Sequence, residues 1–130
     1  MLGLAVVLAG CGTAPPEYES LPADCSQWDV EDDLFQERCV DGPCHGAIEF
    51  PAAGLDLETP GVAARIVDAP SNACRMAVLV EPGDASGGIF VEKLTDDPPC
   101  GLQMPLGEQK LTHAEIECVR EWTAAAAAPR

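Results

Sequence analysis

Cys39-Val40-Asp41-Gly42-Pro43-Cys44-His45 is the stretch that decides which fold is expected of this 130-residue chain. The two cysteine sulfurs can form thioethers with the two vinyl groups of haem, and the imidazole of His45 can reach the iron as proximal ligand. The usual motif places two residues between the cysteines, whereas this one places four. Gly42 and Pro43 are turn residues that can loop out the two extra positions. The motif therefore predicts one covalently attached haem c per chain.

A short helix is expected directly before the motif, at residues 30–39. Its apolar face consists of Val30, Leu34 and Phe35. Acidic residues crowd its first turn, where the helix dipole stabilises negative charge. A glycine and a proline end the helix, so Cys44 and His45 are expected in a turn just beyond it.

The clearest predicted helix is the last one. Thr112 and Glu115 form a T-x-x-E capping box, which is typical of a helix start. The apolar stripe of this helix consists of Ile116, Val119 and Trp122. Alanines at positions 124–128 extend it until Pro129 ends it.

The middle of the chain is expected to contain long loops, because prolines and glycines punctuate residues 46–73. One or two helical turns are predicted at 62–67 and a short strand or extended run at 75–80. A weak helix is predicted from an N-cap at Asp84 to about residue 94. The residues of that helix expected to face inward in part are Ile89, Phe90, Lys93 and Leu94. The fold class that follows is mainly α.

The length and the charge of the chain limit the number of domains and the classes of partner that can be expected. A chain of 130 residues is enough for one small domain. Its 22 acidic and 7 basic residues give a formal net charge of −15. Such a charge repels the phosphate backbone, which excludes nucleic acid as a partner, and it favours a basic partner.

The N-terminus indicates export. A short apolar run ends in Leu8-Ala9-Gly10-Cys11, which resembles a bacterial lipobox. Residues 1–10 are then a leader peptide, Cys11 is the lipidated residue, and residues 11–24 form an extended tether. The apolar run is too short to span a membrane. This pattern predicts a lipid anchor in the bacterial cell envelope, periplasmic or surface-facing; an ordinary secretory leader is the alternative.

The cysteine count leaves two possibilities open. After Cys11, the remaining cysteines are Cys25, Cys39, Cys44, Cys74, Cys100 and Cys118. An even number of cysteines in an exported protein suggests that each one is bonded, either in a disulfide or to haem. Haem at Cys39 and Cys44 would leave four cysteines for two disulfides, and a haem-free chain could form three.

In this order, the segments resemble class I cytochrome c, a family whose N- and C-terminal helices cross and whose short helices and long loops surround one haem. Leu102-Gln103-Met104-Pro105 is similar to the family's distal loop, which presents a methionine to the iron. The stretch from Pro82 onwards is also similar to haem domains of small bacterial outer-membrane lipoproteins. The resemblance implies a cytochrome c-like domain at residues 25–128, with His45 and Met104 as axial ligands.

The resemblance also implies a disulfide pairing. Crossing terminal helices would bring Cys25 to Cys118, and a bridge from Cys74 to Cys100 would pin the loop that carries Met104.

Met76 is the alternative ligand, but it lies in the apolar run at 75–80, a position more typical of core packing.

The function implied is electron transfer by Fe(II)/Fe(III) cycling with a basic redox protein. With both axial positions filled, no open position remains for a substrate, so the chain is not expected to be an enzyme. No catalytic constellation stands out, and His45 and His113 are the only histidines. The alternative is a haem-free, disulfide-stapled envelope lipoprotein that acts as a binding or scaffold module.

Overall fold

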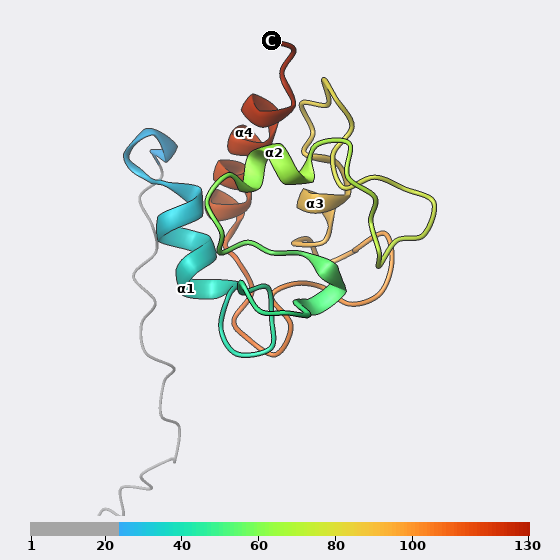
Figure 1. Ribbon diagram of the computed structural model, residues 1–130. Helices are drawn as coiled ribbons and strands as arrows, with labels where there is room; N and C mark the ends of the chain where they lie inside the picture. Colours follow the sequence, from blue (N-terminus) through green and yellow to red (C-terminus); the bar gives the residue numbers. More distant parts are fainter. Residues whose placement is uncertain (1–23) are drawn as a thin grey trace, which may run out of the picture.

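The structure, a computed structural model, describes residues 24–130, which form short helices joined by long loops (Figure 1). The predicted leader, Cys11 and the tether up to residue 23 lie outside the described residues. The helical segments in chain order are η1 (Cys25–Gln27), η2 (Val30–Phe35), α1 (Gln36–Arg38), η3 (Ala52–Gly54), α2 (Val62–Ile66), α3 (Gly88–Glu92) and α4 (His113–Ala127). Within residues 24–130 two isolated β-bridges occur but no strand, which confirms the mainly α fold class.

The helix predicted at 30–39 is present as η2, a π-helix, which continues into α1. Asp29 caps it, because its carboxylate accepts hydrogen bonds from the backbone N–H groups of Glu31 and Asp32 at 2.9 and 3.0 Å. The predicted apolar face is buried: Val30, Leu34 and Phe35 are each less than 5% exposed. This segment therefore ends where the cysteine-histidine motif begins.

Helix α4 begins as its sequence predicts. The backbone N–H of Thr112 donates to Glu115 Oε2 at 2.6 Å, and the N–H of Glu115 donates to Thr112 Oγ1 at 3.2 Å, which completes the capping box. Val119 is fully buried, while Ile116 and Trp122 are half-buried. The helix ends at Ala127, one turn residue before Pro129.

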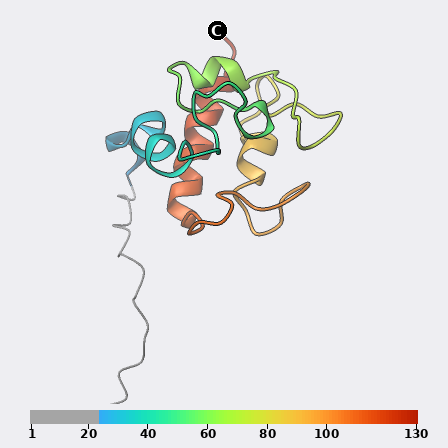
Figure 2. The same cartoon turned by 60° about the horizontal axis from the view of Figure 1, so that its bottom comes forward.

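Helix α4 is the element against which the others pack. It lies between the N-terminal helical segment and α3, and it also contacts α2 (Figures 1 and 2). Phe35 of η2, Phe90 of α3 and Trp122 of α4 form an aromatic cluster, with ring centroids 5.3 to 6.2 Å apart. Phe35 meets the other two rings edge to face, a favourable aromatic geometry. One cluster thus joins three helices that lie far apart in the sequence.

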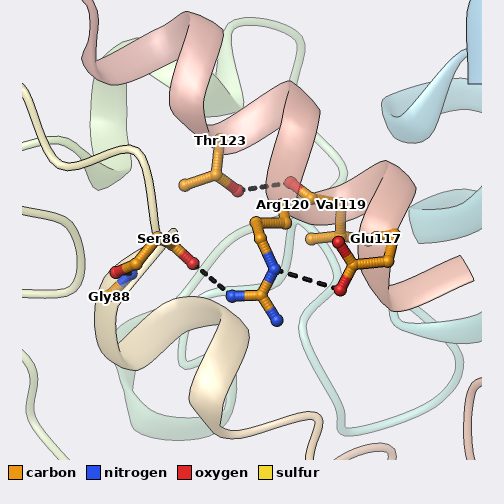
Figure 3. A network of polar contacts seen from close by, with 6 residues as sticks. All are labelled: Ser86, Gly88, Glu117, Val119, Arg120 and Thr123. Carbon is orange, nitrogen blue, oxygen red and sulfur yellow. Dashed lines mark hydrogen bonds and ion pairs between the residues drawn. The ribbon is translucent and has the colours of Figure 1, made fainter. Parts of the chain in front are cut away.

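Polar contacts fix α3 against α4 on another side (Figure 3). The guanidinium of Arg120 donates to the carbonyl of Ser86 at 2.6 Å and to Glu117 Oε1 at 3.2 Å. Ser86 lies in the turn before α3, and its hydroxyl accepts a hydrogen bond from the N–H of Gly88 at 3.2 Å. Arg120 therefore joins α4 to the start of α3.

The structure corrects two predictions for the middle of the chain. A full strand at 75–80 is absent, because Met76 turns the chain with φ of 62°, and the extended alternative holds for the second half, where Val78 and Val80 form isolated bridges with Pro70 and Val67. Asp84 does not cap α3; its carboxylate instead accepts from Ser86 N at 2.7 Å. The helix starts later because Gly87, with φ of 85°, lies in the left-handed region.

Two disulfides staple the fold, Cys25–Cys118 and Cys74–Cys100. They are the two pairs implied by the family resemblance. The first bridge joins the N-terminal helical turn to α4 over a separation of 93 residues. The second joins the segment after η3 and α2 to the loop that carries Met104, over 26 residues. Cys39 and Cys44 carry free thiols.

Loss of the long-range bridge is expected to cost more stability than loss of the short one. Replacing Cys25 and Cys118 together with alanine should lower the free energy of unfolding by about 2–5 kcal/mol, because the unfolded chain regains the entropy of a long open loop. The matched double variant Cys74→Ala and Cys100→Ala removes the bridge that closes the shorter loop. Its free energy of unfolding should therefore fall by about 1 kcal/mol less. Urea unfolding followed by tryptophan fluorescence measures both, and equal losses would contradict the entropic explanation.

Candidate cofactor site

A cavity of about 510 Å³ lies inside the domain, a volume typical of a small-molecule or cofactor site. Its wall is mostly apolar. The apolar lining includes Leu34, Phe35, Leu55, Leu57, Leu79, Ile89, Phe90, Leu94 and Leu111. Three residues singled out from the sequence, Cys39, His45 and Met104, line the same cavity. They come from the end of α1, the loop after it and the loop before α4, so the fold gathers them from three places.

His45 is held at the cavity by a backbone carbonyl. Its Nδ1 lies 3.1 Å from the carbonyl oxygen of Leu55. A carbonyl can only accept, so Nδ1 carries the proton and donates, and in the neutral ring Nε2 keeps its lone pair. Burial lowers the pKa of His45, while backbone hydrogen bonds to Leu55 and Ala52 offset this in part. The imidazole is therefore neutral at pH 7, the state that binds a metal.

The chain between the two cysteines folds back tightly. The N–H of Cys44 donates to the carbonyl of Asp41 at 3.1 Å, which closes a turn through Gly42 and Pro43, and Gly42 has φ of 53°. The N–H of His45 then donates to Cys39 O at 2.9 Å. The turn predicted to loop out the two extra residues is thus present, and it brings His45 back beside the first cysteine.

The two thiols of the motif differ in their surroundings. Cys39 is half-buried and lines the cavity, and its burial raises its pKa to about 12. Arg38 offsets this rise only in part. The thiol of Cys39 is therefore protonated at neutral pH. Cys44 is half-buried as well but does not belong to the cavity wall.

The position of Met104 is set by two lysines. Lys93 Nζ donates to the carbonyls of Cys100 and Leu102, each at 2.6 Å. Lys110 Nζ donates to the carbonyls of residues 103 and 105, at 3.1 and 3.0 Å. The N–H of Met104 in turn donates to Lys93 O at 2.8 Å. We name this arrangement the lysine clamp; it shapes the loop on both sides of Met104.

A single substitution should loosen the clamp. Lys93→Met keeps the apolar stem of the side chain and removes both ammonium hydrogen bonds, each worth about 1.5–3 kcal/mol when the donor is charged. The backbone amide of Met104 should then exchange with solvent about tenfold faster or more, because the loop opens more often. Native-state hydrogen exchange checks this, with Arg130→Met as an exposed matched control. Unchanged exchange at Met104 would show that other contacts hold the loop.

Several other predicted positions can now be judged. All four residues expected to face inward from the α3 segment line the cavity. Met76, which the sequence places in the core, is fully exposed and does not line the cavity. That prediction is wrong because the positive φ at Met76 turns its side chain out of the apolar run. His113, the other histidine, is exposed at the start of α4.

Sequence reasoning missed the residues that position His45 and Met104. Lys93 was expected to face inward, but not to bind the distal loop, and Lys110 was not singled out. The signal available was their rarity: they are two of only seven basic residues, and both lie within eleven positions of Met104. The role of the Leu55 carbonyl has no sequence signal, since every residue has a carbonyl.

The donors present suit a haem. A neutral imidazole, a thioether and one thiol line a mostly apolar cavity, and these are groups that hold haem c; the second thiol of the motif, Cys44, lies outside the cavity wall. No family model, no curated protein and no solved structure matches the chain.

Among residues 24–130, no helix combines the length and the apolar character needed to cross a membrane.

Proposed function

We propose that the chain is a lipid-anchored monohaem c-type cytochrome that transfers electrons. The observation that carries the proposal is the shared cavity: Met104 lines the same mostly apolar space as Cys39 and His45, although it lies 59 residues after His45 in the sequence. Haem iron bound there would supply one-electron Fe(II)/Fe(III) chemistry. A cytochrome c-like fold would account for the N-terminal helical segment packed on α4 and for the long loops between them.

Each residue has a defined part in this proposal. Leu55 orients the His45 ring so that Nε2 would be the nitrogen that holds iron, and burial keeps the ring neutral. Met104 would supply a second protein ligand, and the lysine clamp shapes the loop that carries it. Cys39 and Cys44 would form the thioethers. Two protein ligands would leave no position for a substrate, so the proposed role is transfer and not catalysis.

The apolar wall of the cavity would affect the reduction potential of the proposed haem. A low-dielectric cavity disfavours the more highly charged oxidation state, and a thioether ligand likewise favours Fe(II). Both effects raise the reduction potential. The partner proposed is a basic redox protein, because the chain has a net charge of −15.

Haem staining tests the proposal directly. Protein produced together with a c-type maturation system is separated on a denaturing gel and stained for haem peroxidase activity. We expect a stained band at the mass of the chain, and no band for a variant with both Cys39→Ser and Cys44→Ser. An unstained wild-type band would overturn the cytochrome proposal.

The lipid anchor is a separate part of the proposal. Cys11→Ser removes the thiol that would be acylated, so the variant is expected to appear in the soluble fraction while the wild type sediments with membranes. Fractionation with detergent phase partitioning measures this. A variant that still partitions like the wild type would contradict lipidation at Cys11.

One observation favours the alternative function, a haem-free binding or scaffold module: Cys44 does not line the cavity. A haem-free envelope lipoprotein could pair Cys39 with Cys44 as a third disulfide and use the domain as a binding or scaffold module. The two disulfides present are compatible with this alternative as well.

A further inference from the structure

The loops that carry His45 and Met104 also carry exposed apolar side chains. Five large apolar residues are exposed among residues 24–130, and four of them lie on these loops. Ile48 and Phe50 follow His45 and are 48% and 81% exposed. Leu102 and Leu106 flank Met104 and are 62% and 56% exposed. Single exposed apolar residues are ordinary, but four on two ligand-bearing loops suggest a binding surface.

Both loops border the same cavity. We call residues 40–58 the proximal loop and residues 95–111 the distal loop. The cavity wall includes His45 and Leu55 from the first and Met104 from the second. Arg38, two residues before the proximal loop, donates a hydrogen bond to the carbonyl of Gln109 in the distal loop. The four exposed apolar residues therefore lie on loops that meet around one site.

Acidic residues outnumber basic ones on these two loops by seven to one. The proximal loop contains four acidic residues and no lysine or arginine: Asp41, Glu49, Asp56 and Glu58. The distal loop contains three acidic residues, Asp96, Asp97 and Glu108. Its one cation, Lys110, is engaged with two backbone carbonyls in the clamp. Three neighbouring cations also bind the chain itself: Lys93 in the clamp, Arg38 at a buried position, and the exposed Arg65, which donates to backbone carbonyls of residues 56, 59 and 60. The exposed acids Asp41, Glu49 and Asp97 make no side-chain hydrogen bond or ion pair within residues 24–130, so they remain available around the exposed apolar side chains.

We infer that the proximal and distal loops together form the docking surface for a basic redox protein. This rests on the proposed function and adds the place and the chemistry of the partner. The partner would present an apolar centre to Phe50 and Leu102, with lysines or arginines around it to meet the acidic rim. Such charge complementarity speeds encounter and sets orientation, while the apolar contact supplies affinity. A second copy of the chain suits the surface poorly, because two charges of −15 repel.

Two variants with equal net charge test where a basic protein binds. The rim variant combines Asp41→Asn, Glu49→Gln and Asp97→Asn. The control variant combines Asp32→Asn, Glu81→Gln and Glu121→Gln, which lie outside both loops. All six side chains are exposed, and none makes a hydrogen bond or ion pair within residues 24–130, so the fold is not expected to change. Each variant loses three negative charges.

The probe is mitochondrial cytochrome c, a lysine-rich redox protein, titrated into the full chain at low ionic strength by calorimetry. The rim variant should bind about tenfold more weakly than wild type, a change of about 1.4 kcal/mol, while the control should change by about twofold or less. Phe50→Ser with Leu102→Ser should weaken binding further without altering its salt dependence. Equal losses in the rim and control variants would overturn the docking surface, because net charge alone would then explain binding.

Haem staining of the same samples separates this inference from the function on which it rests. A stained wild type with equal losses in both variants refutes the docking surface alone. An unstained wild type with a selective loss in the rim variant supports a docking surface for a basic protein and refutes electron transfer.

Discussion

The Met104→Ala protein is expected to keep its covalent haem and lose the methionine-to-iron charge-transfer band. The truncated side chain leaves the sixth position without a protein ligand, and the removal of the thioether should lower the reduction potential. We expect a fall on the order of 0.1–0.2 V, a fraction of the roughly 0.8 V range that axial ligands span. Absorption spectroscopy and potentiometric titration measure the two effects.

Met76→Ala is the matched control, because Met76 is fully exposed and does not line the cavity. Its spectrum and potential should equal those of the wild type. If Met76→Ala removes the band and Met104→Ala does not, the distal ligand is assigned to the wrong methionine.

The second large effect expected is an asymmetry between the two cysteines of the motif. Cys39 lines the cavity and Cys44 does not. Cys39→Ala should therefore reduce haem staining to near background, whereas Cys44→Ala should keep a stained band through one remaining thioether. Staining intensity normalised to protein mass measures this. Equal loss in both variants would mean that Cys44 moves to the cavity during attachment, and the opposite order would contradict the assignment of Cys39.

Local sequence rules predicted the elements whose signals are complete within a few residues. The capping box of Thr112 and Glu115 fixes the start of α4, and Val30, Leu34 and Phe35 mark one face of η2. The disulfide pairs followed from a family resemblance and not from local signals. That resemblance also placed His45 and Met104 on one site, and the shared cavity agrees with this placement.

The failures arise where tertiary contacts override a local pattern. A strand or extended run is predicted at 75–80, but Met76 takes a positive φ, and only isolated bridges at Val78 and Val80 form. Asp84 has the chemistry of an N-cap, yet Gly87 delays the start of α3. The lysine clamp joins side chains to backbone carbonyls, which carry no sequence signature. Its cations therefore become interpretable only once the distal loop is folded.

The most direct test of the central claim is mass spectrometry of the peptide that contains the motif. Trypsin cuts after Arg38 and Arg65, so unreduced digestion of protein matured with haem releases residues 39–65 with both cysteines and His45. We predict that this peptide carries the added mass of one haem and that Cys25–Cys118 and Cys74–Cys100 appear as linked peptides. The same peptide without haem, lighter by two hydrogens through a Cys39–Cys44 disulfide, would contradict the cytochrome proposal.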